Sequence, residues 1–274
     1  MWSFIKFVLI FCVSLSNGKE RNCLDQKWIE KTLREAYIPG AAIIVVNSSH
    51  IVHETTFGYH SILPPKRINT RDSVFTLASI SKTFIAAAVM KLVEEKRVDL
   101  DTDINDYLAE PRYRIFNPKY PQYSITLRQL LSHSSSIAVN ESVQISLYDI
   151  GDTAFERSNL ANILFHLLNS NTSNWLPTPP GSASFYSNEG SSLAGLVVER
   201  VTNTSFDEYV KKNIFKPLNI DIDRVGVRLS DFKCQEDLVK HYAYALTNNN
   251  LNDWLEIMPQ LNIQPLLVSK SYEF

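Results

Sequence analysis

The feature that most constrains the fold is an apolar run in the first half of the chain, FIAAAVMKLV, at residues 84–93. The surrounding pattern predicts one helix from Ser79 to about Arg97, and the middle of this helix is apolar nearly all round. Such a helix is stable only when other elements surround it. We therefore expect this helix to be central to the protein rather than superficial.

A β-hairpin is predicted ahead of this helix. Residues 41–46 form an unbroken apolar run typical of a buried strand, and residues 51–58 alternate as a second strand. The polar residues 47–50 between them supply the turn. A lone hairpin is only marginally stable in water, so we expect further strands to pair with it.

Helical patterns flank the hairpin on both sides. Residues 24–37 have helical spacing, short helical pieces recur between residues 101 and 174, and two more helices are expected at 188–201 and 205–214. Strands followed by many helices favour an α+β fold, with an antiparallel sheet flanked by helices and an inserted helical region.

Composition limits the classes of partner. The 274 residues are 45% hydrophobic and carry a net charge of −2, which is typical of a globular chain with one large or two modest cores. A near-neutral chain lacks the basic stripe of a nucleic-acid-binding protein, so no nucleic-acid partner is predicted. Nothing in the sequence fixes the oligomeric state.

The N-terminus, residues 1–18, has the pattern of a secretory signal peptide. Lys6 precedes an apolar run at residues 7–13, and Ser16 or Gly18 would suit the last position before cleavage. The run is too short to cross a bilayer, which needs about 20 apolar residues. We expect a secreted protein with no membrane span after cleavage and one domain over residues 24–274; an uncleaved anchor is the alternative.

Sites of Asn-x-Ser/Thr agree with export, since each is a potential glycan acceptor in a secreted chain. Any single match is often coincidental, so the set supports secretion only modestly. The predicted glycosylation sites are Asn47, Asn140, Asn171 and Asn203.

Two cysteines lie outside the predicted signal peptide, Cys23 and Cys234. In an oxidising compartment they could form a disulfide. The alternative is two unrelated buried thiols, and the sequence does not choose between them.

Ser79 and Lys82 lie three residues apart at the start of the apolar helix and therefore share a face. Unpaired N–H groups at a helix N-terminus favour a developing anion, and a buried lysine there would have a lowered pKa suited to proton transfer. Ser79 could thus attack a carbonyl with Lys82 as its proton partner. The alternative is a helix cap, with Lys82 in solvent. The same spacing recurs at Ser3/Lys6, Ser16/Lys19 and Ser230/Lys233.

A second candidate element is Tyr186-Ser187-Asn188, the only Tyr-x-Asn among the chain's 12 tyrosines. A tyrosine near an ammonium group ionises more easily and can act as a general base. The asparagine amide offers both a donor and an acceptor to a substrate. By itself, however, such a tripeptide is more often a surface turn.

In order along the chain, four segments resemble the serine hydrolases of the class C β-lactamase and penicillin-binding-protein kind. They are IPGAAIIVV, FTLASISKTFIAAAVMKLVEEKRVDLDTDINDYL, ITLRQLLSHSSSI and PPGSASFYSNEGSSLAGLVVERVTNTSFDEYVKKNIFKPLNI. Ser-x-x-Lys is a known signature of related enzymes. The resemblance runs from about Tyr37 to Ile220 and implies an α/β sandwich of the β-lactamase/transpeptidase type.

The resemblance implies roles for individual residues. Ser79 would be the acyl-enzyme nucleophile, Lys82 its proton partner and Tyr186 the general base, while Asn188 would position the substrate. The Ser79 backbone N–H would be one of two oxyanion donors. The family works without metal or cofactor, on small-molecule or peptide substrates: β-lactams, peptides ending in D-amino acids and small esters.

Two departures from the family pattern are evident. Residues 133–137 read HSSSI where the family usually has HTSGL, so Ser136 replaces a glycine and we expect a strained turn. The family's third motif, Lys or His two residues before a glycine, is missing because no glycine follows Gly226. We therefore expect the C-terminal strands of the sheet to be missing. The alternative to a hydrolase is a truncated, non-catalytic relative that binds a ligand or partner.

Other catalytic classes find little support. The sequence has no Gly-x-Ser-x-Gly, the nucleophile motif of α/β-hydrolases. His50 and His53 have a spacing seen in metal sites, but on a strand that spacing points them to opposite faces. No metal site is predicted.

Overall fold

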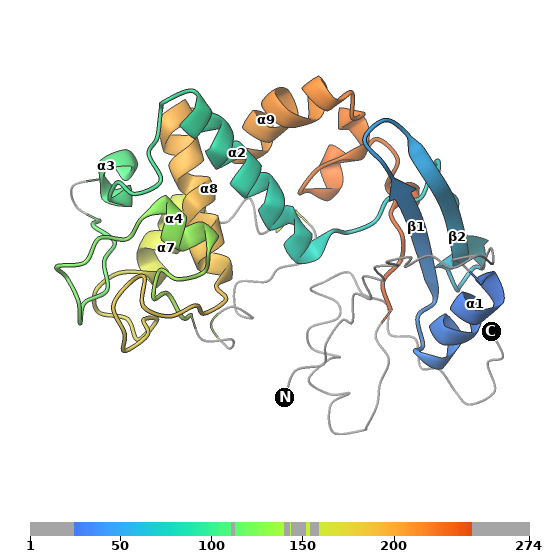
Figure 1. Cartoon of the computed structure of the whole chain (residues 1–274), viewed down its shortest axis with the longest axis horizontal. Helices are drawn as coiled ribbons and strands as arrows, with labels where there is room; N and C mark the ends of the chain where they lie inside the picture. The colour runs from blue at the N-terminus through green and yellow to red at the C-terminus, as the bar shows by residue number, and fades with distance from the viewer. Residues whose placement is uncertain (1–24, 111–112, 140–142, 144–151, 154–158, 243–274) are drawn as a thin grey trace, which may run out of the picture. The chain divides into compact units, whose positions relative to one another are not determined.

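The computed structural model describes residues 25–110, 113–139, 143, 152–153 and 159–242 (Figure 1). The described residues divide into two compact units, one that ends at Arg71 and one that begins at Asp72. Each unit is described below by itself. None of the helices in the described ranges combines the length and the apolarity needed to cross a membrane.

The N-terminal unit contains a helix and a small antiparallel sheet. Helix α1 (Gln26–Glu35) begins where the Asp25 carboxylate accepts hydrogen bonds from two backbone N–H groups. The sheet has the order β1-β2-β3, with β1 (Gly40–Val46), β2 (Ile51–Ser61) and β3 (Lys66–Arg67). The predicted hairpin is therefore confirmed.

Gly58 in β2 allows the two long strands to pair closely. Its φ of +67° lies in the left-handed region, and a Cβ there would come within 2.1 Å of the Pro39 carbonyl oxygen. The partner strand begins at Gly40, which is directly opposite Gly58. The glycine thus fixes the start of the register.

The expectation that the first strand is buried is wrong, because no residue of β1 is buried and the second half of the strand is mostly exposed. Ile44 and Val46 are 57% and 65% exposed, and Ile51 across the turn is 54% exposed. A strand that is buried on both faces needs a layer on each side. The described part of this unit provides one helix, so the apolar residues near the turn have no cover from within it.

The second unit is helical. Its elements are η1 (Ala78–Ser81), α2 (Lys82–Glu94), α3 (Ile104–Leu108), α4 (Leu127–Leu131), α7 (Leu160–Leu167), α8 (Asn188–Thr202), α9 (Phe206–Val210), the π-turn η2 (Lys211–Phe215) and short 3₁₀ turns η3 (Lys216–Leu218), η4 (Ile222–Arg224), η5 (Leu229–Asp231) and η6 (Gln235–Asp237). The helices expected near residues 188–201 and 205–214 are confirmed, as are the short helices between residues 101 and 174.

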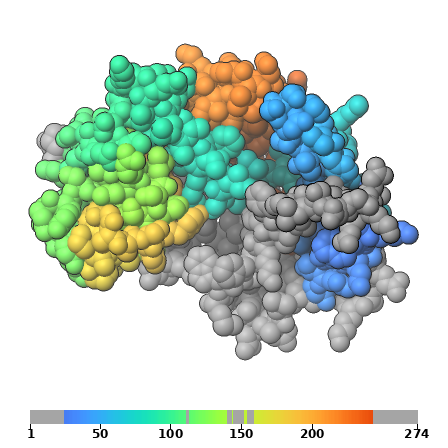
Figure 2. Space-filling view, viewed as in Figure 1, coloured from blue at the N-terminus to red at the C-terminus, as the bar shows by residue number. Residues whose placement is uncertain are grey.

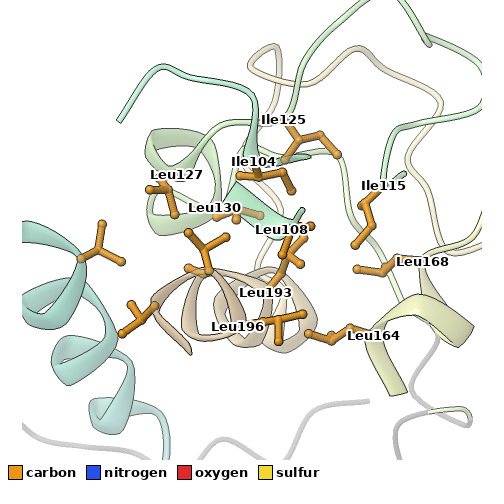
Figure 3. Close-up of a cluster of buried hydrophobic side chains, with 14 of the residues drawn as sticks. Ile104, Leu108, Ile115, Ile125, Leu127, Leu130, Leu164, Leu168, Leu193 and Leu196 are labelled. Atoms are coloured by element: carbon orange, nitrogen blue, oxygen red, sulfur yellow. The ribbon is translucent and has the colours of Figure 1, made fainter. Parts of the chain in front are cut away.

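Helix α8 is the centre of this unit. It packs against α2, α3, α4, α7 and α9. Figure 3 shows leucine and isoleucine side chains from the surrounding elements converging on α8, where Leu193 and Leu196 face them. Fully burying one such side chain stabilises the fold by about 1.5–3 kcal/mol.

The apolar helix at residues 84–93, which we expected to be central rather than superficial, is only partly enclosed. In α2 the side chains of Ala88, Val89 and Leu92 are buried, but Met90 is 48% exposed. Helix α8 takes the central place instead. Its apolar residues Leu193, Ala194, Leu196, Val197 and Val198 are all buried.

The loop between α7 and α8 lies on the surface of this unit, next to the segment that follows α3. Figure 2 shows the two as adjoining yellow and green surfaces. They are joined by hydrogen bonds: the Tyr120 hydroxyl donates to the Pro177 carbonyl (2.8 Å), and the Asn117 amide donates to the Leu176 carbonyl (3.0 Å). The loop that leads to Tyr186 is therefore anchored.

Some predicted features lie outside the described residues, namely the signal peptide at residues 1–18, Cys23 and Asn140. The proposed Cys23–Cys234 disulfide therefore stays a prediction; Cys234 itself is exposed. The remaining glycosylation candidates, Asn47, Asn171 and Asn203, are all exposed. Asn203 ends α8 in the left-handed conformation that asparagine tolerates better than most residues.

Candidate active site

Ser79 lies in the 3₁₀ turn η1, one turn ahead of α2. The residue before it, Ala78, has a φ of +46°, which a non-glycine residue adopts only at a cost. The helix-cap alternative does not describe this structure. The N-cap residues of η1 and α2 are Leu77 and Ser81, while the Ser79 hydroxyl points to other side chains.

Three predicted residues meet at the Ser79 hydroxyl. Lys82 Nζ donates a hydrogen bond to Ser79 Oγ (3.1 Å), and Ser79 Oγ shares a hydrogen bond of 2.5 Å with the Tyr186 hydroxyl. Lys82 Nζ also lies 4.9 Å from the centroid of the Tyr186 ring. A nucleophile, an ammonium group and a phenol are thus within reach of one another.

The site is open to solvent. Tyr186 is 47% exposed, Ser79 is exposed and Lys82 is half-buried. Lys82 is thus neither fully buried, as the catalytic interpretation assumed, nor fully in solvent, as the helix-cap alternative assumed. The reason is local: α2 begins at Lys82 itself, so the side chain leaves the first turn of the helix rather than the apolar middle.

Tyr186 is held in place by the start of α8. The next residue, Ser187, is the N-cap of α8, and its hydroxyl accepts a hydrogen bond from the Gly190 N–H (3.0 Å). Its backbone is extended, with φ of −140°, so Tyr186 lies just outside the helix. Asn188 is the first helical residue and is half-buried.

His133 is a further site residue. In the sequence it stood out only as the first residue of the HSSSI segment at residues 133–137, and no role was predicted for it. Its ring centroid lies 4.6 Å from that of Tyr186, at an interplanar angle of 39°. Its Nδ1 accepts a hydrogen bond of 3.3 Å from the Ser187 N–H. Burial, and then the nearby charge of Lys82, lower the pKa of His133 below its ordinary value. The imidazole is therefore neutral at pH 7.

Ser136, where the family usually has glycine, confirms the expected turn strain. Its φ is +67°, in the left-handed region. Its buried hydroxyl donates to the Thr178 carbonyl (2.6 Å) and accepts a hydrogen bond from the Asn117 amide (2.8 Å). These bonds offset part of the conformational cost.

Within the described residues, no group of three or more His, Cys, Asp or Glu side chains is arranged to hold a metal ion. His50 lies in the hairpin turn, where its ring contacts the Ser49 hydroxyl (2.9 Å) and the Asn47 amide (3.3 Å). Neither contact is with a metal-ligating partner.

The helical unit and the small antiparallel sheet define an α+β protein of the β-lactamase/transpeptidase fold. The model of the family described as Beta-lactamase matches residues 26–249. This match spans more than half of the chain and includes Ser79, Lys82 and Tyr186. The chain therefore belongs to the Beta-lactamase family.

Curated relatives are distant and longer. The chain is 25% identical over 220 residues to Protein flp of Staphylococcus aureus (strain NCTC 8325 / PS 47), covering 80% of this chain and 41% of flp. It is 25% identical over 215 residues to Penicillin-binding protein 4* of Bacillus subtilis (strain 168), covering 78% of this chain and 43% of that protein. The chain thus spans about two fifths of the length of these relatives.

Solved structures bear out the fold. The octameric penicillin-binding protein homologue from Pyrococcus abyssi superposes with a TM-score of 0.65 at 24% sequence identity. The match covers 81% of this chain and 48% of that one. At this level of identity the likeness establishes the architecture, and the chemistry has to be argued from the residues of this chain.

Proposed function

We propose that the protein is a serine hydrolase that cleaves amide or ester bonds through an acyl-enzyme on Ser79. The observation that carries this proposal is the position of Ser79 Oγ, within hydrogen-bond reach of both Lys82 Nζ (3.1 Å) and the Tyr186 hydroxyl (2.5 Å). A nucleophile within reach of a base, which a third group orients, is the general signature of covalent catalysis.

In the first half-reaction, Tyr186 acts in its phenolate form: Ser79 Oγ attacks the carbonyl carbon of the substrate, and the Ser79 proton passes to the phenolate oxygen. The carbonyl π-electrons move to oxygen, where the Ser79 backbone N–H is one donor to the oxyanion. The tetrahedral intermediate then expels an amine or alcohol, which takes the proton. The Lys82 ammonium group stabilises negative charge on Ser79 Oγ and on the Tyr186 oxygen, because it donates a hydrogen bond to Ser79 Oγ and lies close to the Tyr186 ring.

In the second half-reaction, water attacks the acyl carbon and Tyr186 takes a proton from the water. The Ser79–acyl bond breaks, the carboxylic acid leaves and Ser79 regains its proton. Every step uses proton transfer over short hydrogen bonds, so no cofactor is required. The substrate classes most consistent with family membership are β-lactams, peptides ending in D-amino acids and small esters. The likeness to Penicillin-binding protein 4* supports the first of these.

A second candidate is a non-catalytic relative that binds a ligand without turning it over. The observation in its favour is the openness of the site, in which Ser79 is exposed and Tyr186 is 47% exposed. Both candidates leave Ser79 accessible, but only the first makes it reactive.

The deciding experiment is covalent labelling of the full chain with a fluorophosphonate and with a fluorescent penicillin, followed by peptide mapping. We expect label on Ser79 and none in Ser79→Ala. Ser81→Ala is the matched control, because Ser81 is in the same turn and its side chain makes no cap hydrogen bond. Equal labelling of the wild type and Ser79→Ala would refute the proposal, and absence of label from all three would favour the binding protein.

We further propose that the chain is exported, with residues 1–18 removed. The short apolar run and its small-residue flank support this, as does the exposure of Asn47, Asn171 and Asn203. N-terminal sequencing of the protein from the medium of a secreting eukaryotic host, and its mobility before and after enzymatic removal of N-glycans, test this. A product that begins at Met1 and stays with membranes would contradict it.

A further inference from the structure

His133 is placed to control the orientation of Tyr186. Two backbone groups on either side of Tyr186 bond to this one residue. The Phe185 N–H donates to the His133 carbonyl oxygen (2.7 Å), and the Ser187 N–H donates to His133 Nδ1 (3.3 Å). His133 thus accepts two hydrogen bonds from the backbone, one through its carbonyl oxygen and one through its imidazole. Tyr186 lies between the two residues that donate them.

The ring of His133 also packs against the ring of Tyr186, with centroids 4.6 Å apart. This contact matters because Tyr186 is 47% exposed. An exposed tyrosine normally samples several side-chain rotamers, and ordering it costs conformational entropy. A fixed ring on one side restricts Tyr186 to the rotamer that directs its hydroxyl to Ser79.

The position of His133 is itself set by the fold. Residue 133 follows α4 with a φ of +56°, and the next carbonyl, that of Ser134, accepts a hydrogen bond from the Gly181 N–H (2.7 Å). The segment after α4 and the segment before α8 are therefore held together at several points. Tyr186 inherits this rigidity through His133.

We propose that His133 is a positioning residue for Tyr186, holding the phenol over Ser79 through the Nδ1 hydrogen bond to Ser187 and the ring contact. This inference rests on the proposed function insofar as Tyr186 is the base. His133 itself exchanges no proton with substrate.

The charge state of His133 agrees with this role. Nδ1 accepts a hydrogen bond only when it carries no proton, which requires the neutral tautomer protonated on Nε2. The titratable and charged groups that face the ring are Lys82 on α2 and Tyr186 ahead of α8. The positive charge of Lys82 favours the neutral imidazole.

Three substitutions separate the two contacts. His133→Ala removes both, while His133→Asn keeps an acceptor, because the asparagine Oδ1 is as far along the side chain as Nδ1. His133→Gln is the matched control, since its amide lies one bond farther out. We expect the rate of Ser79 labelling by a fluorophosphonate to fall about 10- to 100-fold in His133→Ala and His133→Gln, because small misplacements of a catalytic group cost about that much. His133→Asn should recover most of the loss.

A double-mutant cycle tests whether the effect passes through Tyr186. In a Tyr186→Phe background, His133→Ala should cause little further loss of labelling rate. An equal loss in both backgrounds would overturn the proposal, because His133 would then act independently of the phenol.

Nuclear magnetic resonance tests the positioning role even if Ser79 does not react with the covalent probes. In protein carrying ¹³C-labelled tyrosine rings, the Tyr186 signal is assigned by its absence from Tyr186→Phe. We expect this signal to move to the position of a mobile tyrosine in His133→Ala and to move only part of the way in His133→Asn, which keeps the hydrogen bond but lacks the ring. An unchanged signal in His133→Ala would refute the positioning role. Absence of Ser79 labelling in the wild type would instead refute the proposed function, with the ring signal still reporting on His133.

Discussion

The two compact units of the chain use their apolar residues differently. In the helical unit, leucines such as Leu130 and Leu193 are fully buried around α8. In the described part of the N-terminal unit, the buried hydrophobic residues are Ile29, Phe57 and Ile68, while the isoleucine and valine side chains near the hairpin turn are exposed. The site residues all belong to the unit that packs its own core. The site is open to solvent, but the helices α2 and α8 next to it contribute buried residues to this core.

This difference follows from geometry. A bundle of helices encloses a core from its own segments, whereas a sheet of three strands presents two faces and its described unit supplies one covering helix. Small units bury a smaller fraction of their apolar surface and are correspondingly less stable. The comparison therefore predicts that substitutions will have large effects in the helical unit and small ones near the hairpin turn.

The largest expected effect is on acylation. Lys82→Ala and Tyr186→Phe should each slow the labelling of Ser79 by about 100- to 10,000-fold, the usual contribution of a positioned proton-transfer group. Tyr59→Phe is the matched control in the N-terminal unit, because it keeps the ring that Arg67 covers at 4.2 Å. Rates are measured by quenched-flow or gel-based labelling. A comparable loss in Tyr59→Phe would show that the site depends on both units.

The next effect is on stability. Leu193→Ala, in the middle of α8, should lower the free energy of unfolding of the helical unit by about 2–5 kcal/mol, because it leaves a cavity in a fully buried region. The measurement is urea denaturation followed by pulse proteolysis, with fragments assigned to each unit. A loss below about 1 kcal/mol would mean that the helical core is loosely packed.

Val46→Ala is the counterpart on the exposed part of the hairpin. Val46 is 65% exposed, so its truncation should change stability by no more than about 0.5 kcal/mol. A loss of 2 kcal/mol or more would break the comparison, because it would show that this face is covered in solution.

Substitutions of Ser136 should change stability by an intermediate amount, and comparing alanine with glycine at this position supplies the control. Ser136→Ala should cost about 1–3 kcal/mol, because it leaves the buried Asn117 amide and the Thr178 carbonyl short of a partner and keeps the left-handed φ. Ser136→Gly loses the same bonds but relieves the backbone strain, so it should be less destabilising than Ser136→Ala. Chemical denaturation of both variants tests the order, and the reverse order would show that the strain is negligible.

The smallest effect is the pH dependence from His133. Its pKa is lowered in the folded state, so the unfolded chain binds more protons as pH falls through about 6.5. The stabilisation is complete above that pH and is lost as pH falls towards the folded pKa. Desolvation also lowers the pKa of His241, but this residue is exposed overall, so its contribution in the same direction is the smaller of the two.

Urea denaturation of the wild type, His133→Asn and His241→Gln at pH 7.5, 6.5 and 5.5 separates the two histidines. We expect each variant to have a shallower acid-side decline than the wild type. A wild-type slope that persists unchanged in His133→Asn would show that this imidazole keeps its ordinary pKa when the protein folds.

The sequence predicted the hairpin, most helices and the meeting of Ser79 with Tyr186, for physical reasons. Alternating and helical patterns of apolar residues predict local structure. The motifs at Ser79/Lys82 and Tyr186–Asn188 together predicted a shared site. Burial was harder to predict, because it depends on what covers each face. The all-round apolar pattern of α2 did not reveal that α8, with Gly195 on its packed side, would take the centre.

His133 was missed for a different reason. Its proposed role depends on a hydrogen bond from the backbone N–H of Ser187. Nearly every residue type has such a group, so the sequence at position 187 does not indicate the bond. A neutral imidazole beside a tyrosine also leaves no charge pattern in the sequence. Only the path of the chain brings residues 133 and 186 together.

The site joins two places in the chain that are 107 residues apart, since Ser79 reaches Lys82 within one turn but Tyr186 only through the docking of α8 on α2. During synthesis, the serine and lysine leave the ribosome long before the tyrosine. Closing so long a loop is also the slower event in folding, because distant contacts form after local ones. A nascent chain therefore carries its serine without the base that would activate it. Reactivity toward acylating agents would accordingly arise only once the helical unit is complete.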